Sequence, residues 1–130
     1  MKKLLLLFAV LCLYVMPVHA QEVCDKSVAI SIASGQTAEL VALVSGDSIY
    51  VCGFILTADT IATTATFETG TGTTCNTGTT NLTGAMRLCD ECQITMGSGR
   101  GILFRGLRSN ALCLTTATGA VTGILLYAQY

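Results

Sequence analysis

Six cysteines spread between positions 24 and 113 limit most strongly how this chain can fold. An even number of cysteines in a short exported chain indicates a framework of disulfide bonds. We expect Cys75–Cys113 to be one of these bonds. We expect Cys24 and Cys52 to pair with Cys89 and Cys92, in an order that the sequence leaves open.

The first twenty residues have the pattern of a secretory signal peptide. Lys2 and Lys3 precede an apolar run from Leu4 to Val15, Pro17 interrupts the run, and Ala20 ends a short segment suited to signal peptidase. A run of about twelve residues is shorter than the roughly 20 needed to span a bilayer. The sequence therefore predicts cleavage after Ala20 and one domain over residues 21–130. This domain would be secreted, and would reside in the extracellular space, on a virion or on a cell surface.

Removal of the signal changes which chemistry is available. The single His19 and the single Pro17 leave with it, and five basic side chains remain against eight acidic ones, a net charge of −3. This balance argues against a nucleic-acid partner, which requires a basic surface. Without histidine, Ser-His-Asp and Cys-His hydrolysis are excluded for residues 21–130.

Metal and cofactor chemistry also find little support. Cys89-Asp90-Glu91-Cys92 has the spacing of half a zinc site, but no second half is present. No helical pattern follows Cys92 to activate it as a redox thiol. Adjacent Asp90 and Glu91 point to opposite sides of an extended chain, and no Asp-x-Asp-x-Asp run suggests calcium. We therefore expect no catalytic residue, no cofactor and no metal, and interpret residues 89–92 as a solvated corner.

Short alternating segments with turn residues between them predict an all-β chain. Thr, Val and Ile favour strands, and no helical period occurs after the signal. Gly53 suggests a bulge or a close backbone approach, and Gly123 suggests a bulge. Apolar residues at both odd and even positions predict that the strand at 48–57 is central. The prediction is a single antiparallel β-sandwich. Its strand order stays open, and a jelly-roll-like topology is one of the alternatives. The expected strands are 26–32, 37–44, 48–57, 60–69, 81–88, 93–96, 102–104, 111–116 and 120–130.

The stretch from Gly70 to Cys92 is the most polar part of the chain, although it holds three of the cysteines. Its first part, residues 70–80, is rich in Thr and Gly and lacks the lysine and the strand-to-helix context of a phosphate-binding loop. We expect a surface loop tied down at Cys75. The candidate partner contacts are Thr71, Thr73, Thr74, Asn76 and Thr77 in this loop, and Tyr130 at the end of the last strand.

Five segments after the signal form a further pattern: Gln36–Leu43, Ser48–Phe54, Gly70–Ala85, Ser109–Leu114 and the closing Gly123-x-x-x-Tyr-Ala-Gln-Tyr. Together they resemble small disulfide-containing β-sandwich proteins encoded by phages and bacterial genomic fragments. The resemblance extends over nearly all of residues 21–130, and its motifs are turns and strand ends. It implies a virion or cell-surface structural protein.

The first functional hypothesis is a secreted, non-catalytic structural or adhesive surface subunit. Because little charge opposes strand pairing, we expect self-association through edge strands, with residues 120–130 as the contact. The second hypothesis is a glycan- or ligand-binding module that uses loops 70–80 and 97–101. A small enzyme that relies on carboxylates alone ranks third.

Overall fold

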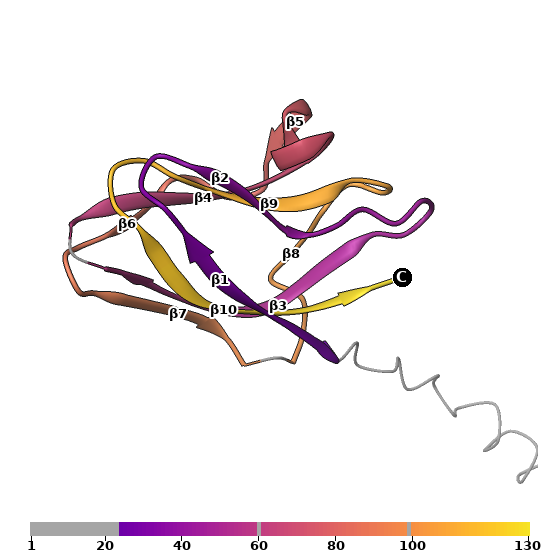
Figure 1. Cartoon of the computed structure of the whole chain (residues 1–130). Helices are drawn as coiled ribbons and strands as arrows, with labels where there is room; N and C mark the ends of the chain where they lie inside the picture. Colours follow the sequence, from indigo (N-terminus) through magenta and orange to yellow (C-terminus); the bar gives the residue numbers. More distant parts are fainter. Residues whose placement is uncertain (1–23, 60, 99) are drawn as a thin grey trace, which may run out of the picture.

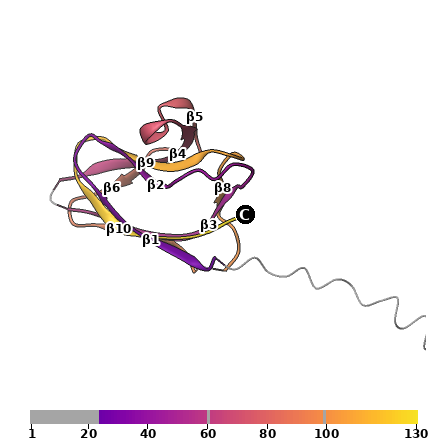
Figure 2. The same ribbon diagram turned by 45° about the vertical axis from the view of Figure 1, so that its right-hand side comes forward.

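The computed structural model describes residues 24–59, 61–98 and 100–130, and it contains two antiparallel five-stranded sheets packed face to face (Figures 1 and 2). This confirms the predicted β-sandwich with disulfides. Within these residues the helical structure is a single 3-10 turn, η1 (Thr73–Cys75). The predicted signal peptide and its cleavage site lie outside the described residues.

We name the two sheets after their central strands. In the β3 sheet the order is β1 (Lys26–Ile32), β10 (Val121–Gln129), β3 (Ile49–Ala58) and β7 (Gln93–Gly97), and β8 (Phe104–Arg105) also pairs with β3. In the β4 sheet the order is β2 (Thr37–Val41), β9 (Ala111–Thr116), β4 (Thr63–Thr71) and β5 (Thr77–Asn81), and β6 (Met86–Leu88) also pairs with β4.

Alternation along each strand supplies the core between the sheets. In β4, Thr63, Ala65, Phe67 and Thr69 are buried, while the residues between them are half-buried on the outer face. The buried Thr69 hydroxyl donates a hydrogen bond of 2.9 Å to the Ala111 carbonyl, so its burial leaves no unpaired polar group.

Three phenylalanine rings meet between the two sheets. Phe54 from β3, Phe67 from β4 and Phe104 from β8 have ring centroids 5.0 to 6.4 Å apart, with tilted planes. Tilted aromatic pairs at this spacing add to the stabilisation from burying their apolar surface. The cluster links the two sheets directly, because its members come from both.

Strand 120–130 was expected to supply the self-association edge, and this is wrong. β10 is hydrogen-bonded on both sides, to β1 along Lys26–Ile32 and to β3 along Ile49–Ala58. Apolar residues occur at both odd and even positions of β10 because the strand lies inside the sheet. The end strand on this side of the β3 sheet is β1.

The two glycine predictions have different outcomes. The β3–β10 register shifts where Gly53 faces Leu126 and Val51 faces Tyr127, which leaves Cys52 as an extra residue and confirms a bulge in β3. Gly123 stays in register with Ile30 and Leu56, so the bulge predicted there is wrong. A Cβ at Gly123 would lie 1.9 Å from the Ile55 carbonyl oxygen, so close backbone approach explains this glycine.

Several predicted boundaries also needed correction. The strand predicted at 37–44 ends at Val41, where the register with β9 shifts after Glu39. The strand predicted at 81–88 is limited to Met86–Leu88, and the one predicted at 102–104 contains only Phe104 and Arg105. The loop predicted at 70–80 contains η1 and most of β5.

The disulfides confirm one expected pair and contradict the others. Cys75 is bonded to Cys113 as expected, but Cys24 is bonded to Cys52 and Cys89 to Cys92. Cys92 lies too far from Cys52 along β3 for these two residues to form a disulfide. The Cys92 carbonyl accepts a hydrogen bond from Ala58, which is about six residues or ~20 Å from Cys52 in an extended strand. A disulfide requires Cα atoms within about 7 Å.

Phe67→Ala should lower the free energy of unfolding by about 3–5 kcal/mol, because it leaves a cavity where the two sheets meet. Phe67 is 0% exposed, whereas Leu107 is 50% exposed and provides a matched control. Leu107→Ala should cost less than about 1 kcal/mol. Urea unfolding followed by circular dichroism measures both values, and equal losses for the two variants would contradict the placement of the core.

Candidate functional site

Residues 70–81 form a compact excursion over the outer face of the β4 sheet, which we call the 70–81 cap. In Figures 1 and 2, η1 and β5 stand above this sheet on the side away from the β3 sheet. Beneath them, Cys75, Ala111 and Cys113 form a small buried cluster separate from the main core. The Cys75–Cys113 bond therefore fixes the cap onto outward-facing positions of β9.

The cap has tight local packing. A Cβ at Gly70 would lie 2.6 Å from the Cys75 carbonyl oxygen, and one at Gly72 would lie 2.4 Å from Oδ1 of Asn76. Thr74 and Cys75 have φ values of 61° and 55°, which are unfavourable for side chains other than glycine. The disulfide and these contacts hold the strained turn, so the exposed threonines are presented from an ordered backbone.

The predicted partner contacts divide into two groups. Thr73, Asn76 and Thr77 are exposed on the cap, and Thr71 and Thr74 are half-buried. Tyr130 follows β10 in the other sheet, where its ring stacks on Tyr50 with centroids 4.7 Å apart. Tyr130 is 52% exposed. The structure therefore presents Tyr130 on a different sheet from the cap.

The two loops of the glycan-binding hypothesis also belong to different sheets. The cap lies over the β4 sheet, whereas residues 97, 98, 100 and 101 lie at or after the end of β7 in the β3 sheet (Figure 1). Gly97 packs against β3 so closely that a Cβ there would lie 2.2 Å from the Cys52 carbonyl oxygen. The fold does not combine these loops into one surface.

Sequence reasoning missed a polar row on the outer face of the β4 sheet. The Thr37 and Thr115 hydroxyl oxygens are 2.7 Å apart, and the Thr115 hydroxyl donates to Oε1 of Glu68 at 2.6 Å. Glu39 and Glu68 are each paired with Cys113 from neighbouring strands, so one carboxylate lies on either side of β9. Only the strand order brings them together, and no local motif indicates it.

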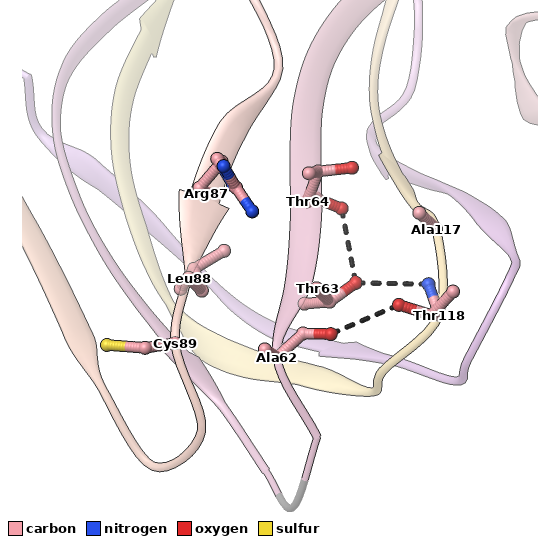
Figure 3. A pocket seen from close by; sticks show the side chains of 8 residues that line it. All are labelled: Ala62, Thr63, Thr64, Arg87, Leu88, Cys89, Ala117 and Thr118. Atoms are coloured by element: carbon pink, nitrogen blue, oxygen red, sulfur yellow. Dashed lines mark hydrogen bonds between the residues drawn. The ribbon is translucent and has the colours of Figure 1, made fainter.

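A shallow hollow lies at one end of β4 (Figure 3). Two of its three threonine hydroxyl groups are used internally: the Thr118 amide donates to the Thr63 hydroxyl at 3.1 Å, and the Thr118 hydroxyl donates to the Ala62 carbonyl at 3.1 Å. Arg87 is the charged side chain at its rim. The residues lining the hollow are Ala62, Thr63, Thr64, Arg87, Leu88, Cys89, Ala117 and Thr118.

Asp90, Glu91 and three arginine side chains are exposed. Asp90 and Glu91 lie on the corner between β6 and β7, where the disulfide of their flanking cysteines closes the turn. Arg100, Arg105 and Arg108 are also exposed, and Arg108 donates from Nε to the Gly46 carbonyl at 2.6 Å. Among residues 24–59, 61–98 and 100–130, no group of three or more His, Cys, Asp or Glu side chains is arranged to hold a metal ion.

The four strands at the ends of the two sheets differ in how they are protected. β1, with seven residues, is longer than β2, β5 and β7, which have five each. β2 has the exposed Glu39 at its middle and a register shift beside it. β5 is distorted by Gly78 with φ 61° and by a register shift in its pairing with β4. Charges and bulges are common means of blocking edge-to-edge pairing, and β1 lacks both over residues 27–32.

No protein-family model and no curated protein sequence matches this chain. Among solved structures, it is similar to a chain in the structure of infectious bursal disease virus Gx strain, with a TM-score of 0.33 and 11% sequence identity. The match covers 78% of this chain and 32% of the viral chain. A likeness at this level does not indicate what the chain does. In the described part of the chain, no helix has the length and apolarity to cross a membrane.

Replacing Cys75 and Cys113 together by alanine should lower the free energy of unfolding by about 4 kcal/mol, because this bond closes a long loop in the unfolded chain. It should also raise amide hydrogen exchange throughout the 70–81 cap. The matched control is the double alanine variant of Cys89 and Cys92, whose short loop predicts a loss of about 2 kcal/mol. Unchanged exchange in the cap would contradict its anchoring by the disulfide.

Proposed function

We propose that this protein is a non-catalytic structural subunit of a virion or cell surface, which assembles when β1 pairs with β1 of a second copy. The observation that carries the proposal is the uncharged and self-complementary edge of β1. The sequence-level arguments for export and against histidine-dependent catalysis favour the same role, as does the resemblance to small phage and bacterial β-sandwich proteins.

The two faces of β1 suit an extended sheet. Val28, Ile30 and Ile32 face the core, while Ala29 and its neighbouring serines are exposed on the outer face. β10 occupies one side of β1, and no strand among the described residues pairs with the other side. Backbone amide and carbonyl groups on such a side are available for pairing with an added strand.

The order of residues in β1 favours an antiparallel pair of identical strands. When two copies pair about a two-fold axis at Ala29, Ala29 faces Ala29 and Val28 faces Ile30. Ser27 then faces Ser31, so the apolar row continues across the junction and the hydroxyl row continues beside it. A two-fold contact uses the same surface of both copies, so this surface must be complementary to itself. The cross-strand pairs are chemically alike at every one of these positions.

The charge balance permits this contact. Lys26 is the single charged residue in β1 and lies at its end, where the two-fold pairing would place it opposite Ile32. The symmetric alternative at β2 would bring Glu39 of two copies close together, and like charges in opposing positions destabilise a sheet. The β1 edge therefore combines greater length with the absence of such repulsion over residues 27–32.

Ala29→Lys should reduce association at least tenfold, because two ammonium groups would face each other across the junction. Ala29→Glu should do the same, and an equimolar mixture of the two variants should restore the dimer through opposite charges. Analytical ultracentrifugation of the exported protein over a range of concentrations measures the three dissociation constants.

Thr122→Lys provides the control, because Thr122 is exposed on the same outer face but belongs to the central strand β10. Association should be unchanged in this variant. A wild-type protein that stays monomeric at high concentration would overturn the proposal, and so would equal effects of Ala29→Lys and Thr122→Lys.

A further inference from the structure

The three disulfides lie in two different environments. Cys52, Cys75 and Cys113 are at most 1% exposed, so each of the two long-range bonds has at least one fully buried sulfur. In the third bond, Cys89 is exposed and Cys92 is half-buried, and only two residues separate them. Access of an attacking thiol to sulfur is a main determinant of the rate of disulfide exchange.

The corner around the third bond has its own backbone support. The Cys92 amide donates to the Cys89 carbonyl at 3.1 Å, and the Cys92 carbonyl accepts from the Ala58 amide at 3.2 Å. β6 precedes the corner and pairs with β4, while β7 follows it and pairs with β3. Since strand pairing holds both sides, opening this bond leaves the sandwich in place.

We propose that Cys89–Cys92 is a thiol-exchange site, chemically distinct from the two structural disulfides, and that it reacts with low-molecular-weight thiols. A thiolate attacks the exposed Cys89 Sγ, forms a mixed disulfide and breaks the bond to Cys92, which leaves as a thiolate and takes up a proton. A second thiolate attacks the mixed disulfide, releases Cys89 as a thiol after protonation and leaves with the first as an oxidised dimer. The protein gains the two electrons that the two small thiols lose.

The charges at the corner give the site a preference among thiols. Asp90 and Glu91 lie between the two cysteines and are exposed, so they repel an anionic thiol and attract a cationic one. Arg87 is the nearest basic residue along the chain. Figure 3 shows its guanidinium directed toward β4 and the Cys89 sulfur pointing away from the hollow. Cysteamine should therefore react faster than glutathione, relative to their intrinsic rates with a small disulfide.

Trypsin separates Cys89 and Cys92 from the other four cysteines of the three disulfides, because basic residues occur at positions 26, 87, 100, 105 and 108. Peptide 88–100 contains Cys89 and Cys92 alone. Cys24 falls in the peptide that ends at Lys26, Cys52 and Cys75 fall in 27–87, and Cys113 falls in 109–130. The folded protein is incubated with either thiol, quenched with N-ethylmaleimide, digested and analysed by mass spectrometry. Peptide 88–100 then reports the disulfide, the mixed disulfide and the doubly labelled thiols as separate masses.

Label should enter peptide 88–100 about tenfold faster than the three peptides that hold Cys24, Cys52, Cys75 and Cys113. The preference for cysteamine should be about threefold and should disappear in Asp90→Asn/Glu91→Gln, whose exposed positions leave the core untouched. Comparable labelling rates for all three disulfides would overturn the proposal. A preference that persists in the double variant would overturn the assignment of charge selectivity to Asp90 and Glu91.

Discussion

Contact between the inward faces of the two sheets is the interaction on which the rest of the molecule depends. Phe54, Phe67 and Phe104 meet there, and aliphatic side chains from both sheets surround them. Because every strand except β5 gives one face to this core, chemistry is confined to the outer faces, the edges and the corners. The cap, the β1 edge and the Cys89–Cys92 corner each occupy one of these three places.

The strands were largely predictable, since alternation is a local property that the chain displays residue by residue. The position of a strand within a sheet was not. The apolar residues of 120–130 fit an edge contact or a central strand equally well, and only pairing with β1 and β3 distinguishes them. The same limit explains the two wrong disulfide pairs, because which sulfurs meet depends on strand order. It also explains why the Glu39–Glu68 pair across β9 was missed.

The three disulfides perform different tasks. Cys75–Cys113 fastens a polar excursion to a sheet that would otherwise have an open outer face, and it creates a second small buried cluster there. Cys24–Cys52 ties the start of β1 to the bulge of β3, within one sheet. Cys89–Cys92 holds a turn that strand pairing already supports from both sides. Cys75–Cys113 is the most buried of the three bonds, Cys24–Cys52 is intermediate and Cys89–Cys92 is the most exposed.

The Cys24–Cys52 bond has a mechanical consequence for a chain that pairs through β1. Strand exchange between copies would require β1 to detach from β10, but its first residues are covalently held to the sheet's central strand. In the proposed pair, two copies would therefore join at this edge without swapping strands. A load that pulls the two copies apart would pass from β1 through the Cys24–Cys52 bond into β3, and would not break the β1–β10 hydrogen bonds one after another.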